Sequence, residues 1–383
     1  MPRSLRLAIV SPYPLLPLSA GGKIRIFHLA RELGQLGVEV TILCPWKPGT
    51  DRPSLPNGGR VVRIPYPFLL QHLLTDRPFP YQFLVSWHPG YAALARAHLR
   101  HADIVQIEHA SFADLVEALP PGMPVVYDAH NVEHDYVTSE CRQPIVRDLV
   151  GRRIFGLEGA LARRADHIAA CSADDARRLA QFYGAPEDRI SVVPNGIATT
   201  RADGASASEV FDRLPGLEAW RHRALFAGSD VEHNRQAVRF LRGTLAPQLA
   251  PIGGAIVIKG GCARPLGHEL PTNVFLDPND GDIGGVAAAC TVALHPVVQG
   301  GGTNLKVLDY LAHGLPVVST EFGFRGYPDL CRHAEIRPLS EFAEAVVRPT
   351  PTGPSLATDL EPYLWGSGAR TLHEIYRHLT RPA

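Results

Sequence analysis

Short apolar runs alternate with amphipathic stretches along the first half of the chain. Apolar runs of four to seven residues predict strands, and stretches with helical periodicity predict helices between them. Runs that are apolar on both faces are typical of parallel strands covered by helices on both sides. The expected strands are at residues 5–11, 39–44, 61–65, 104–107, 125–128, 167–171 and 190–193, and the expected helices at 22–36, 145–164 and 173–183.

A second series of the same kind follows a strong turn signal at Pro194-Asn195-Gly196 and a stretch of small polar residues at 198–208. The tail is broken by prolines at 349–354 before a helical pattern at 357–379. The fold class predicted is therefore α/β, with two Rossmann-like domains facing a cleft. We expect an N-terminal domain at 1–197, a second domain at 198–354, and a C-terminal helix at 355–383 that crosses back to the first domain. The second series comprises strands at 224–227, 255–258, 274–276, 292–295 and from 317, with helices at 233–245, 283–290 and 303–313.

The run from Gly300 to Ser319 is the most informative part of the chain. The glycines 300–302 allow a tight turn, and the helix expected after them directs its free N–H groups and positive dipole end into that turn. Gly314 is a suitable left-handed helix stop, and Pro316 prevents continuation. The run predicts an anion site, and the alternative is a surface connection that binds no ligand.

Composition limits the classes of function. The 383 residues contain 38 basic and 38 acidic side chains, so no overall charge favours nucleic acid, and we expect no nucleic-acid partner. The six cysteines are widely spaced and suit a reducing cytoplasm. No apolar stretch has the length of an export signal or of a membrane span, so we expect a cytoplasmic protein.

Two further motifs follow the first and fifth expected strands. Gly21-Gly22 stand just before a helix, where backbone can approach a phosphate or a sugar, although the spacing of a Walker loop is missing. The segment 130–134 reads His-x-x-Glu-His, which in zinc peptidases lies on a helix. Here His130 falls at a strand exit, so we expect no metal and a histidine that hydrogen-bonds a sugar hydroxyl. A solvated loop histidine is the alternative.

The expected helix at 303–313 carries two more candidates. Asp309 lies about two turns from the anion and could accept hydrogen bonds from ribose hydroxyls, whereas Lys306 could neutralise phosphate. A solvated helix face is the alternative for both. The pairs Arg152-Arg153 and Arg163-Arg164 on the long helix at 145–164 could contact anionic lipid, or could also form a solvated face.

With these motifs assembled, the chain resembles the GT-B glycosyltransferases, and within them the retaining family 4 type. The resemblance spans nearly the whole length. It rests on the order of Gly21-Gly22, the segment 128–133, the segment 165–172, the segment 193–197, Gly228 with its neighbours, and the long motif at 300–319. It implies a nucleotide-sugar bound mainly by the second domain and an acceptor site in the first.

The resemblance also implies roles for single residues. His130 matches the histidine near the donor sugar, and Gly21 and Gly22 match the loop that faces donor phosphate and acceptor. Asp309 takes the place of the second glutamate of the family's Glu-x7-Glu motif, and Gly301 takes the place of the first. The remaining donor-side positions are Gly228, Ser229, Gly302, the backbone amides of Thr303, Asn304 and Leu305, and Lys306 and Arg235 as replacements for the usual basic pair.

The resemblance therefore leads us to expect a glycosyltransferase that uses a nucleotide-sugar as co-substrate, without other cofactor or metal and with retention. The acceptor expected is a glycan or a lipid-linked glycan in surface polysaccharide or glycolipid synthesis, with peripheral contact at the inner membrane face. Two alternatives stay open: a non-catalytic subunit that binds nucleotide-sugar or glycan, and a sugar-nucleotide epimerase. The loops at 46–57 and 65–89 are expected to be lid or acceptor-side elements.

Overall fold

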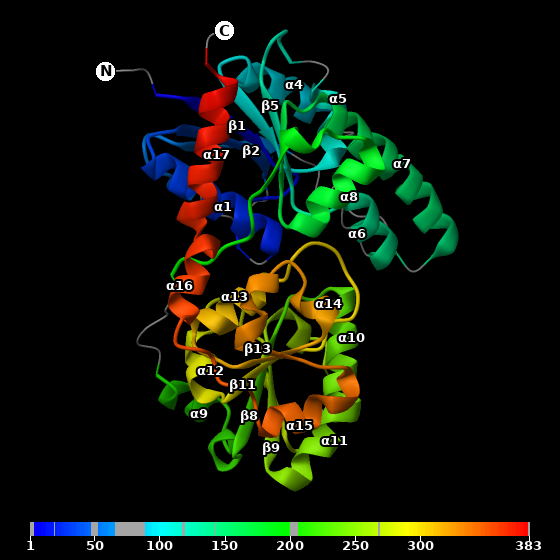
Figure 1. Ribbon diagram of the computed structural model, residues 1–383, viewed down its shortest axis with the longest axis vertical. Coiled ribbons are helices and arrows are strands. Elements are labelled where there is room, and N and C mark those ends of the chain that lie inside the picture. The colour runs from blue at the N-terminus through cyan, green and yellow to red at the C-terminus, as the bar shows by residue number, and fades with distance from the viewer. Residues whose placement is uncertain are drawn as a thin grey trace. The chain divides into compact units, whose positions relative to one another are not determined.

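The computed structural model describes residues 4–18, 20–46, 53–65, 89–116, 119–141, 143–199, 206–266 and 269–381. The chain forms two compact units (Figure 1). One unit comprises residues 1–195 and 365–383, and the other comprises residues 196–364. The division lies two residues before the expected one. Residues 355–364, expected in the C-terminal segment that crosses back, instead belong to the second unit. Most of the two expected lid or acceptor-side loops lies outside the described residues.

The first unit is built on a seven-stranded sheet in the order β3-β2-β1-β4-β5-β6-β7. All of its neighbouring strands pair in parallel, as the apolar runs predicted. The order reverses direction between β1 and β4, so the carboxyl ends of these strands lie beside a topological switch point. The strands are β1 (Arg6–Val10), β2 (Glu39–Trp46), β3 (Arg60–Pro65), β4 (Ile104–Ile107), β5 (Val125–Ala129), β6 (His167–Ala170) and β7 (Ile190–Val192).

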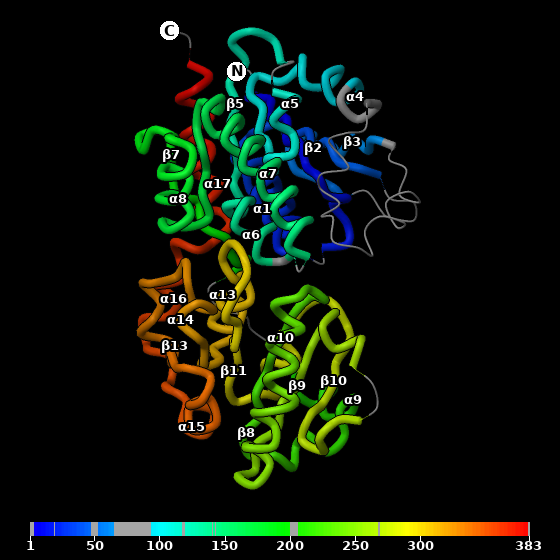
Figure 2. The backbone as a smooth tube through the Cα atoms, turned by 90° about the vertical axis from the view of Figure 1, so that its right-hand side faces the viewer, coloured from blue at the N-terminus to red at the C-terminus, as the bar shows by residue number. Residues whose placement is uncertain are grey.

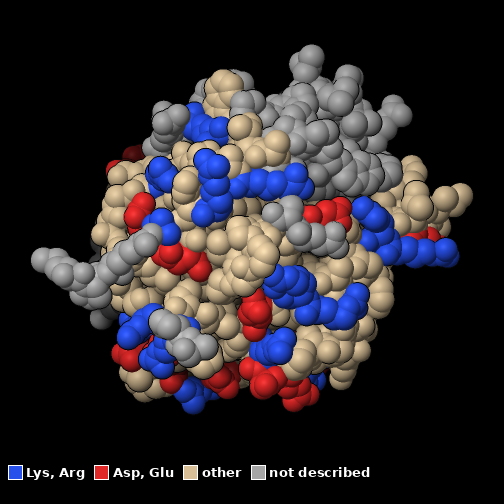
Figure 3. All heavy atoms as spheres, turned by 90° about the horizontal axis from the view of Figure 1, so that it is seen from above, with Lys and Arg blue, Asp and Glu red and all other residues tan. Residues whose placement is uncertain are grey.

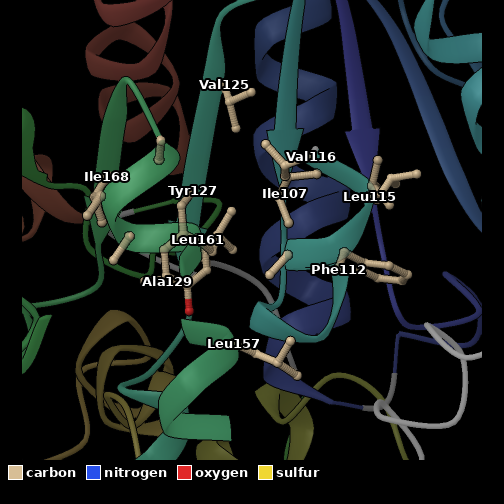
Figure 4. Packing of buried hydrophobic residues seen from close by; sticks show 14 of the residues in the cluster. Ile107, Phe112, Leu115, Val116, Val125, Tyr127, Ala129, Leu157, Leu161 and Ile168 are labelled. Carbon is tan, nitrogen blue, oxygen red and sulfur yellow. The ribbon is translucent and has the colours of Figure 1, made fainter. Parts of the chain in front are cut away.

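Helices cover this sheet (Figure 2). One core cluster joins Ile107 and Val125 of the strands to Leu157 and Leu161 of the long helix, and all four are buried (Figure 4). Burial of such aliphatic side chains contributes about 1.5–3 kcal/mol each, which fixes the helix against the sheet. The helices are α1 (Gly21–Gln35), α4 (Pro89–Leu99), α5 (Ala113–Val116), α6 (Glu133–Glu140), α7 (Pro144–Arg164), α8 (Ala173–Tyr183) and α17 (Trp365–Leu379).

The second unit repeats the architecture with a six-stranded parallel sheet in the order β10-β9-β8-β11-β12-β13. Both sheets thus confirm the α/β fold class. The strands are β8 (His222–Ala227), β9 (Gly254–Lys259), β10 (Val274–Asp277), β11 (Val292–His295), β12 (Val317–Ser319) and β13 (Ala334–Ile336). The helices are α9 (Ser208–Arg213), α10 (Glu232–Phe240), α11 (Ala246–Leu249), α12 (Gly284–Ala289), α13 (Leu305–Ala312), α14 (Glu321–Phe324), α15 (Phe342–Val347) and α16 (Leu356–Leu360).

Three helices differ from the predicted limits. The helix expected at 233–245 ends at Phe240 and continues as a π-helical turn, Leu241–Leu245, just before Pro247. The helical tail expected at 357–379 is interrupted by a 3₁₀ turn, Glu361–Tyr363, because Pro362 lacks the N–H that a continuous helix needs. The glycine-run helix begins at Leu305 rather than Thr303, since Asn304 is still extended.

The surface and the helices bear on the partner classes considered above. Figure 3 shows basic and acidic side chains interspersed on the face it presents, in keeping with the equal numbers of the two kinds. In the described part of the chain, none of the helices combines the length and the apolarity that a membrane span requires.

Candidate functional site

In the first unit, three titratable side chains meet at the carboxyl ends of two neighbouring strands. Glu108 follows β4, Asp128 lies in β5, and His130 follows β5. His130 Nε2 lies 2.6 Å from Glu108 Oε2 and 3.9 Å from Asp128 Oδ2. All three side chains are buried. The predicted site histidine is therefore held inside the fold by carboxylates, and is not a solvated loop residue.

Arg25 of α1 neutralises the second of these carboxylates. Its guanidinium donates to Asp128 at 2.6 Å, and both side chains are almost fully buried. The same guanidinium donates to the carbonyl of Pro194 at 3.2 Å and to Asn195 Oδ1 at 3.3 Å. Burial opposes the charge on Arg25, but Asp128 outweighs it and raises the arginine pKa. The turn motif at 194–196 thus helps to complete the charge balance of the site.

Gly22 explains how His130 fits beneath the start of α1. A Cβ atom at this position would lie 2.9 Å from His130 Nδ1, closer than side-chain atoms approach. No side chain caps the helix at Ala20, and its first turn carries no acidic residue. The predicted pair of Gly21 and Gly22 thus opens an uncapped helix N-terminus beside the ring of His130.

The His-x-x-Glu-His segment does not bring its two histidines together as a metal pair. His134 lies 3.4 Å from Asp135 and packs edge-on against Phe155, whereas Glu133 pairs with His109 at 3.1 Å. Among the described residues, the donor atoms that do converge, within 4.8 Å, belong to Glu108, Asp128 and His130. Arg25 already neutralises Asp128 there, so a divalent cation would have to displace an existing ion pair.

In the second unit, the glycine run forms the turn that its sequence predicted. Gly300 and Gly302 have positive φ angles of 136° and 60°, and Gly314 ends the helix with a φ of 70°. Arg325 donates to the carbonyl of Gly302 at 2.8 Å and so fixes the loop. No side chain caps α13 at Asn304, and its first turn has no acidic residue. The loop therefore leads into a helix end that is suited to an anion.

Lys306 is directed at a neighbouring amide. Its Nζ donates to Asn234 Oδ1 at 2.8 Å and lies 5.0 Å from the ring centroid of Phe226. Burial lowers the pKa of Lys306 to about 8. Asn234 in turn donates to the carbonyl of Ser229 at 2.9 Å, and a Cβ at Gly228 would lie 2.8 Å from its Nδ2. Asn234 therefore links the loop at Gly228 and Ser229 to Lys306 of α13.

The remaining predicted positions differ in how closely they join this group. Arg235 is bound to Asp230 at 2.7 Å on the surface, so it belongs to a separate ion pair. Asn304 donates to the carbonyl of Gly323 at 2.9 Å. Burial raises the pKa of Asp309 to about 6. Gly301, Thr303 and Leu305 lie at the entrance to α13 and are partly exposed.

Sequence reasoning missed His295, at the carboxyl end of β11. Its ring is fully buried, beside the amide of Asn304. Burial, together with the charges of Lys306 and His233, lowers the pKa of His295 well below its ordinary value. Glu108, Arg25, Asn234 and Arg325 were also missed. Glu108 lies just after a strand and Arg25 lies near Gly21-Gly22, whereas Asn234 lies within α10 and Arg325 follows α14, where the sequence carries no such signal.

Comparison with known proteins assigns both units. Residues 20–201 match the family described as Glycosyltransferase Family 4, and residues 221–348 match Glycosyl transferases group 1. A curated relative, the D-inositol 3-phosphate glycosyltransferase of Nocardiopsis dassonvillei, is 26% identical over 225 residues. That match covers 55% of this chain and 48% of the relative, so the chain spans about half of the relative's length.

Solved structures share the fold over nearly the whole chain. Sucrose-phosphate synthase from Thermosynechococcus elongatus matches with a TM-score of 0.76 and 14% identity, over 98% of this chain and 99% of its own. WaaG, a glycosyltransferase involved in lipopolysaccharide biosynthesis, matches with a TM-score of 0.65 and 18% identity, over 96% of this chain and 95% of its own. Anabaena HepE in complex with UDP and glucose matches with a TM-score of 0.61 and 13% identity, over 99% and 97%.

Proposed function

Because the chain belongs to the GT-B glycosyltransferases, with a family 4 domain followed by a group 1 domain, we propose that it transfers a sugar from a nucleotide-sugar to a glycan or lipid-linked acceptor. One observation carries the proposal. The glycine turn leads into the uncapped N-terminus of α13, and Lys306 of that helix hydrogen-bonds only a neutral amide in the described structure. A helix end, backbone amides and a cation together favour a diphosphate.

The same groups supply what the reaction needs. As the glycosidic bond breaks, negative charge collects on the leaving diphosphate, and preorganised amides and Lys306 stabilise it. Because these groups provide the positive potential, we propose that no metal is required. His130 then hydrogen-bonds the donor sugar, and Asp309 accepts from the ribose hydroxyls. Retention follows where the acceptor hydroxyl attacks from the leaving-group face and passes its proton to an oxygen of the departing diphosphate.

Uridine is the base we propose to test first, because the HepE structure holds UDP. A thermal-shift screen of UDP, GDP, ADP and their sugars should raise the unfolding midpoint for one base, since a ligand that binds only the folded state stabilises it. Transfer by the purified protein with that donor, unchanged by EDTA, would support the proposal. NMR of the product then gives the anomeric configuration, and inversion would exclude retention.

Gly301 favours a second candidate, a non-catalytic subunit that binds nucleotide-sugar or glycan. This glycine replaces a carboxylate that, in the family the chain resembles, helps to position the donor sugar. Binding without turnover across a broad donor and acceptor panel would support this candidate. Epimerisation of the nucleotide-sugar without acceptor would instead identify an epimerase.

For the acceptor side we propose peripheral contact with the inner membrane face and a role in surface polysaccharide or glycolipid synthesis. The supporting feature is α7, where Ile145 and Leu149 are 85% and 64% exposed at a helical spacing of four residues. Arg152 and Arg153 follow on the same helix. Exposed apolar side chains beside arginines favour an anionic lipid surface. Sedimentation with anionic vesicles, and none with neutral vesicles, is the expected result.

A further inference from the structure

A chain of hydrogen bonds links the last helix of the protein to His130. The hydroxyl of Tyr376 on α17 donates to Gln106 Oε1. Gln106 Nε2 donates to Glu108 Oε1 at 2.6 Å, and Glu108 Oε2 lies 2.6 Å from His130 Nε2. Tyr376, Gln106 and Glu108 are at most 1% exposed. Water therefore does not compete for these contacts, and each partner decides the orientation of the next.

The direction of donation along the chain fixes the tautomer of His130. Tyr376 occupies the oxygen of the Gln106 amide, so the NH₂ group of that amide is turned toward Glu108. When Glu108 is ionised, both of its oxygens accept, and His130 Nε2 must then carry a proton to be its partner. The ring therefore presents Nδ1 on its other side. That atom is buried, has no hydrogen-bond partner in the described structure, and lies beside Gly22.

Other charged groups also act on His130. Asp128 on β5, Arg25 on α1 and Glu133 at the start of α6 each interact electrostatically with the ring. Burial opposes protonation of His130, but the hydrogen bond and charge of Glu108, together with Asp128, outweigh it and raise the histidine pKa. With a second proton, Nδ1 becomes a hydrogen-bond donor at the uncapped end of α1.

Helix α17 is held firmly enough to act as the fixed end of this chain. The ring of Trp365 stacks on His28 of α1 at 5.4 Å with an interplanar angle of 6°. A Cβ at Gly368 would lie 3.3 Å from Leu29 and from Val193, so α17 and α1 pack in close contact. Tyr376 lies two to three turns further along the same helix and reaches β4.

We propose that Tyr376, Gln106 and Glu108 are positioning residues that set the tautomer and the proton occupancy of His130, so that docking of α17 makes the site histidine competent. This inference rests on the proposed function for the role of His130 in transfer. The chain of hydrogen bonds itself is independent of that role. Tyr376 and Gln106 act through Glu108 and touch no reacting group.

The direct test is an NMR titration of the His130 imidazole, assigned by its loss in His130→Asn. In the natural protein we expect Nε2 to remain protonated over the whole titration. Glu108→Gln should lower the midpoint of the His130 titration by about one pH unit or more, because the carboxylate that favours the charged ring is gone. An unchanged midpoint in Glu108→Gln would overturn the proposal, whether or not the protein proves to transfer sugar.

The role of α17 needs a second variant with a matched control. Tyr376→Phe keeps the ring and removes only the hydroxyl, so it should alter the His130 titration and lower kcat for transfer about 3–10-fold, with nucleotide affinity unchanged. Tyr183→Phe removes a comparable buried hydroxyl, which donates to Glu158 at 2.7 Å and is not part of the hydrogen-bond chain to His130. It should leave the His130 titration and kcat unchanged.

These outcomes separate the two proposals. Equal effects of Tyr376→Phe and Tyr183→Phe on the His130 titration would mean that loss of any buried hydroxyl is sufficient to change that titration. This result would overturn the proposed role of the hydrogen-bond chain. Absence of transfer by the natural protein across all donors would overturn the proposed function alone, because the NMR readout needs no turnover.

Discussion

In the first unit, Arg25 and His130 each lie against a buried carboxylate, whereas in the second unit Lys306 and His295 each lie beside a neutral amide. The first arrangement balances its own charge. In the second unit, Lys306 is partly removed from water, and no acidic side chain of the described structure forms an ion pair with it. Removing the charge of Lys306 from water costs free energy, and an anionic ligand that binds beside it offsets that cost.

The groups around His130 and Lys306 both lie near the carboxyl ends of parallel strands, but their difference in charge suits them to different tasks. A balanced, hydrogen-bonded group around His130 is suited to a neutral sugar hydroxyl, because it adds little net charge. The group around Lys306 is suited to a diphosphate. Mutations should therefore affect stability most in the first unit and ligand affinity most in the second.

The largest effect is expected for Arg25→Ala. Removing this arginine leaves Asp128 charged and buried, which should lower the free energy of unfolding by about 3–5 kcal/mol. Urea unfolding followed by circular dichroism measures it. Arg178→Ala is the matched control, because its pair with Asp135 is 44% and 31% exposed, and the loss there should stay under about 1 kcal/mol. Equal losses in the two variants would contradict the claim that burial makes the Arg25–Asp128 pair costly to break.

A smaller effect, on binding instead of folding, is expected for Lys306→Ala. Loss of the cation should weaken UDP binding about 10–100-fold, which corresponds to about 1.4–2.8 kcal/mol. Calorimetric titration near neutral pH gives the affinity. Arg337→Ala, which removes an exposed arginine paired with Glu335 in the same unit, should leave the affinity unchanged. Unfolding of Lys306→Ala should need at least as much urea as before, since no ion pair is broken and the cost of burying the cation is removed.

How far the sequence predicts these two sites depends on how local their signals are. The helix at 173–183 was predicted at both ends, because Ser172 caps it by accepting from Asp175 N and Gly184 ends it with a φ of 65°. The glycine turn at 300–302 was predicted for the same reason. In both cases, residues within a few positions of one another determine the conformation.

Residues paired across long stretches of chain could not be found in this way. Arg25 and Asp128 are 103 positions apart, and Tyr376 and Gln106 are 270 apart. No spacing rule links such residues, and each alone resembles an ordinary helix or strand position. The same limitation hid Asn234, whose importance comes from its contacts with Ser229 in one loop and with Lys306 in α13. The fold class was confirmed because it depends on repeated local patterns, whereas the partners of His130 depend on sheet order.

A weaker effect on binding is expected for Asp309→Asn. If the carboxylate accepts from the ribose, the amide keeps one acceptor oxygen and loses the charge, so UDP affinity should fall about 3–10-fold. The same substitution should lower the affinity for 2′-deoxy-UDP less than the affinity for UDP. Burial raises the pKa of Asp309 to about 6, so folding disfavours its charged form. The free energy of unfolding of Asp309→Asn at neutral pH should therefore be equal to or above that of the natural protein, and a large loss would point to a structural role instead.

The smallest effect is the pH dependence that Lys306 imposes. Its pKa falls from 10.5 to about 8 on folding, so the free protein loses this charge as the pH rises through about 8. UDP affinity should decline a few-fold between about pH 7.5 and 9.5, and calorimetry at several pH values should give a flat profile for Lys306→Ala.

The free energy of unfolding of the unliganded protein has the opposite pH dependence. Between the two pKa values the unfolded chain binds the extra proton, so this residue makes the unliganded protein more stable as the pH rises. If both UDP affinity and the free energy of unfolding of the natural protein fell as the pH rose, Lys306 would be paired with an opposite charge, as Arg25 is in the first unit.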